Sequence, residues 1–445
     1  MGEFLTTAFL AGLVALLTPC VFPMIPVTLA FFTKQATNKD GQVNSGGVVR
    51  LALLYCLGII AAFVLIGVGI SATVGASGAY RFATHPLTNL GFATLFVIFG
   101  LAMLEVFNLD LPPALQGLAG GRRSGTLGVL VMGLTFVVTA FTCTAPFVGS
   151  VLILASKATG AQALLKPVAG MAVFALALSL PFFILALFPP LLAKLPRSGA
   201  WLSTVKGAMG FLEIAAALKF LSNTDLVWGW GVLSREVFLG LTALTLTVAG
   251  LWLLGRLKLG HATPSVEAPP LRKLWAGLFI AFAVYCLYGI RGHMDRLMET
   301  YVPPYRLGAK ADAPIKGELV WIRNLEEGKA LAQKEGRRVL IDFTGHTCVN
   351  CRDVETNVFT KAPVQEQLRK FSLVRLYVDP GKMDGIVTSE EQATKNYDYE
   401  DKAFGALTQP LYGVIEPDGT IVAKTDYTVA KSVDGMAAWL EKQAK

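Results

Sequence analysis

The sequence of 445 residues is short of charge. Only 16% of its residues are Asp, Glu, Lys or Arg, whereas an ordinary soluble domain holds about 25%. Apolar residues, in contrast, make up 53% of the chain. This composition excludes a single soluble globule and a disordered chain, and it favours a protein that lies partly in a membrane.

The shortage of charge is confined to one part of the chain. Residues 1–290 hold 17 Lys and Arg and 8 Asp and Glu, whereas residues 291–445 hold 22 and 23. The sequence therefore joins an apolar two-thirds to a water-soluble third. The net charge of +8 arises in the apolar part, where Lys and Arg in loops set membrane orientation, so it does not indicate a nucleic-acid partner.

Eight stretches are long and apolar enough to cross a bilayer as helices. They are residues 4–32, 48–74, 87–107, 126–155, 164–190, 204–221, 231–256 and 271–290. The sixth is the weakest, because Lys206, Glu213 and Lys219 interrupt it. The first has no charged segment before it, and we therefore do not interpret it as a cleavable signal peptide.

The loops predict how the chain lies in the membrane. Those on one side of the eight spans hold 12 Lys and Arg residues, and those on the other side hold 5. The richer side is predicted to be cytoplasmic. For a bacterium, we expect a multi-pass inner-membrane protein with both termini and the C-terminal third on the periplasmic face. Loss of the weak sixth span would invert that assignment.

Cysteine is also scarce, but two of the six cysteines share one context. Cys20, which follows Pro19, and Cys143 both read Cys-x-x-Pro, with Pro23 and Pro146. They lie three predicted spans apart, in the first and the fourth, so the two halves run in opposite directions, as in an inverted repeat with a site near the bilayer midplane. Proline breaks a helix, and broken backbone at membrane depth lines protein or a water-filled cavity, where a thiolate is able to react. In the alternative, both cysteines only fill space and the prolines only kink; the matched pair favours chemistry.

Other polar groups in the apolar part have weaker contexts. Cys56 and Cys286 lie in plain apolar runs and are interpreted as core filler. Glu105 is close to the end of a predicted helix, at the membrane interface. Glu213 is in the middle of a helix, where a carboxylate is costly and often functional, and proton handling stays open as its role.

The polar third predicts a linker, 291–317, and an α/β layer fold, because strands alternate with helices. The expected elements are a helix over 319–335, a strand at 339–343, a helical run to about 370, strands at 371–378, 412–416 and 420–424, and a final helix at 433–442. The acidic stretch 379–401 is expected to be a surface insertion without assigned chemistry.

Cys348 and Cys351 form a Cys-x-x-Cys motif between a strand and a helix. At the helix N-terminus, unpaired amides and the helix dipole favour the thiolate of the first cysteine, and the second resolves the mixed disulfide. Half of a zinc site is the competing interpretation. It is disfavoured because a structural zinc ion takes four ligands, and this region offers only His346 in addition.

Three further residues are candidates for supporting roles. Asp342, six residues before Cys348, is placed to exchange a proton with the buried thiol. Glu355, one turn after Cys351, either tunes the pair or is a solvated helix residue. Pro410 precedes a strand; a cis peptide there would hold a partner peptide against the disulfide, and the alternative is a plain loop proline.

With these motifs, the chain resembles the thiol:disulfide interchange proteins of the DsbD type, and its membrane part is similar to the CcdA-like cytochrome c biogenesis family. The resemblance covers nearly the whole length. It implies a polytopic α-helical membrane bundle of about eight helices with an inverted 3+3 repeat (1–290), the linker (291–317) and an α/β thioredoxin-like domain (318–445). The family's usual N-terminal periplasmic domain is expected to be absent, because the chain begins almost directly in the first span. Either a separate protein replaces that domain, or the thioredoxin-like domain reduces clients itself.

The resemblance also implies an electron path. Cytoplasmic thioredoxin, itself supplied by NADPH, reduces a Cys20–Cys143 disulfide; the membrane pair reduces Cys348–Cys351; and that pair reduces periplasmic disulfide proteins, in cytochrome c maturation or disulfide isomerase reduction. No bound cofactor or metal ion is expected. Two alternatives stay open: an oxidising pathway of the reverse direction, with an electron sink such as a quinone, and a solute transporter with an appended thioredoxin-like domain.

Overall fold

The structure is a computed structural model. It describes residues 2–16, 18, 21, 28, 45–73, 84–106, 133–134, 136–137, 140, 144, 148, 151, 162–187, 199–257, 259, 269–292, 294–303, 319–383, 386–405 and 408–444. The chain divides into two units, which are described in turn. The first comprises Met1–Ala83, Thr94–Ala217 and Thr245–Ile280, and the second comprises Thr84–Ala93, Leu218–Leu244 and Ala281–Lys445.

Five helices in the described ranges are long and apolar enough to cross a membrane, judged by length and composition. They are α3 (Ser45–Thr73), α5 (Pro86–Met103), α8 (Gln162–Leu187), α11 (Arg235–Leu253) and α12 (Pro270–Arg291). They correspond to the second, third, fifth, seventh and eighth predicted spans. The predicted fold class, a helical membrane part followed by an α/β domain, is confirmed.

The three remaining predicted spans have different outcomes. Within 4–32, the structure describes the shorter apolar helix α1 (Gly2–Ala15), and most of 126–155 lies outside the described residues. The stretch 204–221 falls within α10 (Gly199–Trp228), a helix of 30 residues. At 1.5 Å per residue, α10 is about 45 Å long, enough to cross a bilayer. The total of eight spans stays a prediction.

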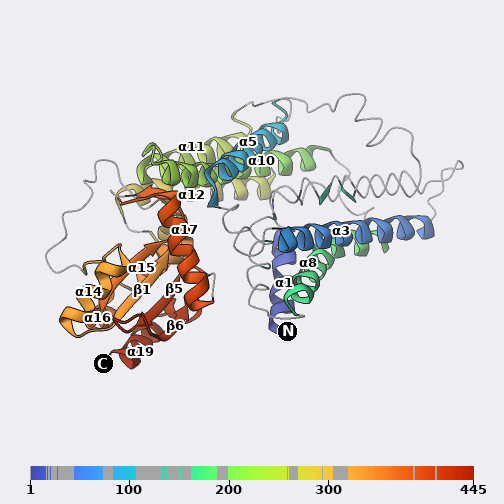
Figure 1. Cartoon of the computed structure of the whole chain (residues 1–445). Coiled ribbons are helices and arrows are strands. Elements are labelled where there is room, and N and C mark those ends of the chain that lie inside the picture. The colour runs from blue at the N-terminus through green and yellow to red at the C-terminus, as the bar shows by residue number, and fades with distance from the viewer. Residues whose placement is uncertain are drawn as a thin grey trace, which may run out of the picture. The chain divides into compact units, whose positions relative to one another are not determined.

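Helices α1, α3 and α8 pack together around an aromatic core in the first unit (Figure 1). The ring of Tyr55 lies 5.6 Å from that of Phe182, which in turn lies 5.4 Å from Phe136. Gly12 lets α1 and α8 approach closely, because a Cβ atom there would lie 2.5 Å from the carbonyl oxygen of Phe174. Small residues at such crossings are typical of membrane helices, where packing replaces the hydrophobic effect.

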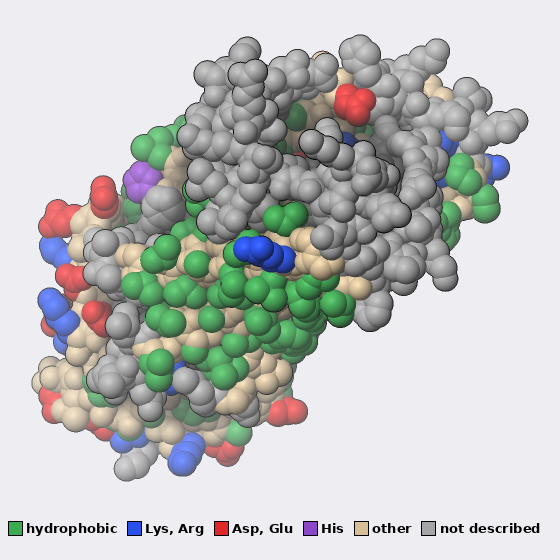
Figure 2. All heavy atoms as spheres, turned by 90° about the vertical axis from the view of Figure 1, so that its right-hand side faces the viewer, with side chains coloured by type: hydrophobic (Ala, Val, Ile, Leu, Met, Phe, Trp, Pro, Cys, Tyr) green, Lys and Arg blue, Asp and Glu red, His purple; other side chains and the backbone are tan. Residues whose placement is uncertain are grey.

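Hydrophobic side chains are also exposed on the outside of the long apolar helices. Figure 2 shows a face on which they gather with few charged side chains among them. Exposed examples are Leu65 of α3, Leu87 of α5 and Leu244 of α11. Soluble monomers rarely expose large apolar patches, so exposed apolar side chains on these helices fit contact with lipid.

The second unit contains a four-stranded mixed sheet in the order β2-β1-β5-β6 (Figure 1). The strands are β1 (Val339–Thr344), β2 (Ser372–Tyr377), β5 (Leu411–Ile415) and β6 (Ile421–Asp426). β1 runs parallel to β2 and antiparallel to β5, and β5 runs antiparallel to β6. Alternation along β1 sends its side chains to opposite faces of the sheet.

Helices cover both faces of this sheet. On one face, α15 (Val349–Asn357), α16 (Ala362–Leu368) and α19 (Val433–Gln443) pack over Leu340 and Val414. On the other face, α14 (Leu325–Glu335) brings Gly328 against Val374 of β2. The stretch 379–401, expected as a surface insertion, begins with a hairpin of β3 (Gly381–Met383) and β4 (Ile386–Thr388) and continues into α17 (Glu390–Tyr399). The π-helix η2 (Glu400–Phe404) and the short helix α18 (Tyr427–Ala430) complete the domain.

Two predicted helices differ from the structure. Residues 319–324 are not helical: the side chain of Asn324 caps α14 by accepting from the amide of Glu326 at 2.9 Å, and Ile322 instead bridges Val374. The expected helical run to about 370 is two helices, α15 and α16, with Pro363 at the start of the second. Local capping and proline positions, which the periodicity alone does not reveal, account for both corrections.

The predicted linker 291–317 begins with an ordered helix, α13 (Arg296–Tyr301). The guanidinium of Arg296 donates to both carboxylate oxygens of Asp353 in α15, at 2.6 Å each. Glu299, on the same short helix, forms a bidentate ion pair with Arg235 of α11. In this unit α13 therefore connects the start of α11 with the helix that follows Cys348.

Candidate redox site of the soluble domain

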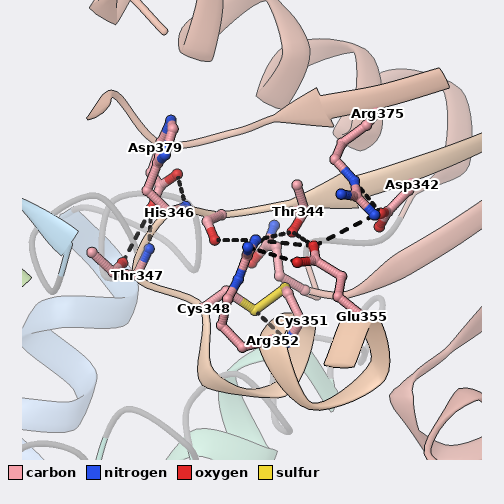
Figure 3. Close-up of a disulfide and its surroundings, with 12 residues drawn as sticks. Asp342, Thr344, His346, Thr347, Cys348, Cys351, Arg352, Glu355, Arg375 and Asp379 are labelled. Carbon is pink, nitrogen blue, oxygen red and sulfur yellow. Dashed lines mark hydrogen bonds and ion pairs between the residues drawn. A yellow bond between two sulfur atoms is a disulfide. The ribbon is translucent and has the colours of Figure 1, made fainter. Parts of the chain in front are cut away.

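A disulfide joins Cys348 and Cys351 at the start of α15 (Figure 3). Cys348 is the N-cap residue, and its sulfur accepts a hydrogen bond from the amide of Cys351 at 3.1 Å. Cys351 is 1% exposed, whereas Cys348 is partly exposed and the intervening Val349 and Asn350 are exposed. The unpaired amides of the helix start stabilise a thiolate at Cys348. Cys348 is therefore the sulfur that a partner can reach, and Cys351 is the shielded one.

The loop between β1 and this disulfide is fixed by Asp379. Its carboxylate accepts hydrogen bonds from the amide of His346 at 2.6 Å, and from the amide and hydroxyl of Thr347 at 3.1 Å each. The ring of His346 stacks on Tyr377, with centroids 4.2 Å apart, and its Nε2 lies 3.1 Å from the hydroxyl of Thr388. These contacts hold the two residues before Cys348.

His346 adds no positive charge to the site at neutral pH. Burial, together with the positive charges of Arg352 and Arg323, lowers its pKa to about 3. The ring is neutral, and it serves as a packing and hydrogen-bonding group next to Cys348. In the described part of the chain, no group of three His, Cys, Asp or Glu side chains is arranged to hold a metal ion.

A network of alternating charges lies beside the disulfide (Figure 3). Arg375 of β2 donates to Asp342 of β1 at 2.8 Å and lies 3.7 Å from Glu355 of α15. Glu355 is also paired with Arg352 at 2.6 Å and accepts from the hydroxyl of Thr344 at 3.1 Å. Glu355 is thus an ion-paired residue shielded from solvent rather than a solvated helix residue.

Asp342 is wholly buried within this network. Burial raises its pKa to about 6, although the neighbouring Arg375 opposes that effect. Its Oδ1 has no hydrogen-bond partner among the described residues. A carboxyl group that titrates near neutral pH is able to take up and release a proton, the property expected of a general acid and base.

Pro410 lies at the same edge of the sheet as the disulfide. The Gln409–Pro410 peptide bond is cis. Leu411, the next residue, pairs with Phe343 in antiparallel register, so Pro410 is level with Thr344 at the end of β1. From this end of β1 the chain continues directly into the loop that carries Cys348.

Sequence reasoning missed Arg375 and Asp379. Arg375 is the register partner of Asp342 in the neighbouring parallel strand, and Asp379 follows the end of that strand. Because parallel strands end at the same edge of a sheet, both belong near Cys348 once β2 is known to lie beside β1. The available signal was that Arg375 lies in a predicted strand and Asp379 just after it. The order of the strands in the sheet, which brings both residues to the site, could not be predicted from the sequence.

The predicted membrane site lies outside the described residues. This holds for Cys20, Cys143, Pro19, Pro23 and Pro146. Their pairing therefore stays a prediction.

Other polar groups singled out in the membrane part are described. Cys56 and Cys286 are buried free cysteines, as their interpretation as core filler requires. Glu213 is wholly buried in α10, and Glu105 lies two residues past the end of α5.

The fold and the site define a class: a multi-pass membrane protein that carries a thioredoxin-like domain with a Cys-x-x-Cys disulfide. Residues 2–224 match the family described as the cytochrome C biogenesis protein transmembrane domain, and residues 320–415 match the thioredoxin-like family. Because the first match covers half of the chain, the chain belongs to the cytochrome c biogenesis transmembrane-domain family.

Several curated proteins are similar over most of this chain. Thiol:disulfide interchange protein DsbD 1 of Pseudomonas aeruginosa is 29% identical over 384 residues, which are 82% of this chain and 60% of that protein. DsbD of Pseudomonas sp. is 29% identical over 85% of this chain and 63% of that protein, and DsbD of Yersinia enterocolitica is 27% identical over 81% and 57%. The chain thus spans about three-fifths of the length of these relatives.

Proposed function

We propose that this chain is a transmembrane thiol–disulfide reductase that passes electrons from the cytoplasm to disulfide proteins on the periplasmic face. The observation that carries the proposal is the Cys348–Cys351 disulfide at the start of α15, with one sulfur accessible and the other 1% exposed. The names of the curated relatives support thiol–disulfide interchange as the chemistry.

The reductive step uses both cysteines of the soluble domain. The thiolate of Cys348 attacks one sulfur of a client disulfide, forms a mixed disulfide and releases the first client thiolate. The thiolate of Cys351 then attacks the sulfur of Cys348 and displaces the second client thiolate. Overall, the client gains two electrons and two protons. The Cys348–Cys351 dithiol loses them and becomes a disulfide.

In this proposal the membrane cysteines restore the reduced state. Cys20 and Cys143, each in a Cys-x-x-Pro context of an inverted repeat, form a dithiol that reduces the soluble-domain disulfide and is itself oxidised. Pro19, Pro23 and Pro146 break the helices that hold them and give the sulfurs access to each side in turn. Cytoplasmic thioredoxin, reduced at the expense of NADPH, then reduces the membrane disulfide.

The surrounding residues have separate proposed roles. Asp342 exchanges a proton with the shielded thiol of Cys351, because its pKa of about 6 lies near the working pH. Glu355 tunes the pair through its ion pairs with Arg352 and Arg375. Pro410, level with the end of β1, holds the client backbone beside the disulfide.

The full route can be tested with purified chain in lipid vesicles. Reduced thioredoxin is supplied on one side, and an oxidised protein such as insulin on the other. The proposal predicts insulin reduction by the parent chain and none by the Cys20→Ala or Cys143→Ala variants. Insulin reduction that continues unchanged in both variants would contradict the claim that the membrane cysteines carry the electrons. Oxidation of thioredoxin without reduction of insulin would contradict the proposed transfer of electrons from the chain to client disulfides.

A further inference from the structure

A buried carboxyl group of the soluble domain, that of Glu400, has no part in the chemistry above. Glu400, the first residue of η2, is wholly buried, and its Oε2 accepts a hydrogen bond from the side chain of Gln409 at 2.9 Å. The backbone amide of Thr408 also bonds to this carboxyl group. Its other oxygen, Oε1, has no hydrogen-bond partner within the described ranges. Glu400 therefore holds both residues that precede Pro410.

The helix that carries Glu400 is itself fixed to the sheet. The ring of Phe404 lies 5.4 Å from Phe343 of β1, edge to face. It also occupies the space over Gly413 of β5, where a Cβ atom would lie 2.5 Å from the ring. Lys424 of β6 donates to the carbonyl oxygen of Phe404. Glu400 is thus positioned by β1, β5 and β6, through a π-helical turn of the kind that is frequent at functional sites.

The segment Thr408–Pro410, which Glu400 holds through these hydrogen bonds, lies close to the loop of the disulfide. The segment leads into β5 at the edge where β1 ends, and β1 continues into the loop of the disulfide. A wholly buried carboxyl group carries a desolvation cost, and burial raises the pKa of Glu400 to about 8. An apolar residue would pack there without that cost, but it would leave Thr408 and Gln409 without their acceptor.

We propose that Glu400 is a positioning residue that fixes the Thr408–Pro410 segment as the surface on which the backbone of a protein client aligns next to Cys348. This inference rests on the reductase function proposed above. It names the class of substrate for which Glu400 matters. Extended polypeptides around a disulfide need the segment, whereas a small aromatic disulfide that only has to reach the sulfur of Cys348 does not.

The test compares two substrates of the full-length chain in detergent micelles. The chain is reduced, freed of reductant and mixed with excess insulin or with the small aromatic disulfide dithiobis-nitrobenzoate, in a Cys20→Ala background so that the membrane pair does not contribute. Oxidation of the Cys348–Cys351 pair is followed at increasing substrate concentration. This gives a half-saturating concentration and a limiting rate for insulin, and a second-order rate for the small disulfide.

Glu400→Leu is expected to raise the half-saturating concentration of insulin about tenfold, the effect of losing a buried hydrogen-bond acceptor. The limiting rate and the rate with the small disulfide stay at the parent values. Glu400→Gln, which keeps an acceptor oxygen, behaves as the parent. The matched control is Glu391→Leu, because the side chain of Glu391 is 79% exposed on α17.

Two results would overturn the inference: equal losses with both substrates, as a general folding defect gives, or no loss with either. If Glu400→Leu yields little folded chain, Gln409→Leu removes only the donor and is expected to show the same selective loss for insulin. A parent chain that reduces the small disulfide but never insulin would contradict the proposed function itself. This failure is seen in the parent chain alone, so it is distinct from a failure of the Glu400 inference, which needs the variants.

Discussion

The cysteines of the soluble domain and those of the described membrane helices lie in opposite surroundings. Cys348 caps a helix and, with Cys351, lies beside a network of two arginines and two carboxylates (Figure 3). Cys56 and Cys286 are buried inside long apolar helices, where the thiol of Cys56 contacts only the carbonyl oxygen of Ser179 at 3.6 Å among the hydrogen bonds described. Reactivity therefore follows from what surrounds a thiol, since a helix start and nearby charges stabilise a thiolate and apolar packing does not.

The largest expected effect is at the soluble-domain pair itself. Cys348→Ala is expected to abolish insulin reduction and to leave no covalent adduct, because the accessible nucleophile is gone. Cys351→Ala also abolishes turnover but accumulates a mixed disulfide between Cys348 and the client, visible as a band shift on a non-reducing gel. Adducts in Cys348→Ala instead of Cys351→Ala would reverse the assignment of nucleophile and resolving thiol.

Asp342→Asn is expected to slow turnover about tenfold or more above pH 6, because a buried proton acceptor is lost. Below pH 6 the difference from the parent narrows, since the carboxyl group of Asp342, with a pKa of about 6, is then protonated in the parent as well. A pH profile of insulin reduction for both chains measures this. A constant ratio between pH 5 and 8 would remove Asp342 from proton transfer.

The same substitution is expected to stabilise the domain. When folding raises the pKa of a carboxyl group, the free energy of unfolding falls as the pH rises from the pKa in the unfolded state, about 4, to the pKa in the folded state. Asp342→Asn is therefore expected to stabilise the domain at pH 7, and this gain disappears toward about pH 4, where Asp342 is protonated in the parent as well. Urea midpoints of the full chain, measured by pulse proteolysis in micelles, report this difference. Equal midpoints at pH 7 would contradict the buried, raised-pKa carboxyl group.

A smaller effect is expected at the pair between α13 and α15. Hydrogen bonds from Arg296, Tyr427 and Asn357 lower the pKa of Asp353, against the opposing effect of burial. Arg296→Ala is expected to cost about 1 kcal/mol at neutral pH, because the arginine side chain is half exposed and Asp353 keeps its other partners. This cost disappears as pH falls below about 4 and Asp353 is protonated. The same urea series measures it, with Lys329→Ala at an exposed ion pair as the control.

The smallest effect is expected at the membrane cysteines of the apolar helices. Cys56→Ala and Cys286→Ala leave electron transfer to insulin unchanged and cost about 1 kcal/mol or less in packing. Assay of thioredoxin-dependent insulin reduction in vesicles checks both. A Cys56→Ala chain that folds but does not pass electrons would contradict the difference in surroundings from which this prediction follows.

The sequence predicted the parts of this site that lie close together along the chain. Cys348, Cys351, Asp342 and Glu355 are all within 14 positions, so strand-to-helix spacing was enough to place them. Arg375 was not found because its contact with Asp342 depends on which strand pairs with β1. Sequence periodicity carries no information on strand order.

Glu400 was missed for a different reason. It stands in an acidic stretch, 379–401, whose composition is typical of a solvated surface, yet its side chain is wholly buried. Phe404 packs against Gly413 and Phe343, and this packing turns Glu400 inward. Contacts between residues far apart in the sequence are not visible in the local charge pattern. Composition therefore described the exposed positions of the segment and failed at its two buried carboxyl groups, Asp379 and Glu400.

Whether electrons reach the soluble domain through the membrane cysteines can be measured by alkylation trapping of Cys348 and Cys351 in intact cells. The comparison is between the parent chain and Cys20→Ala. Outward electron flow predicts a pair that is reduced in the parent and oxidised in the variant. An oxidised pair in the parent that becomes reduced in Cys20→Ala, or the same redox state in both chains, would contradict the proposed route.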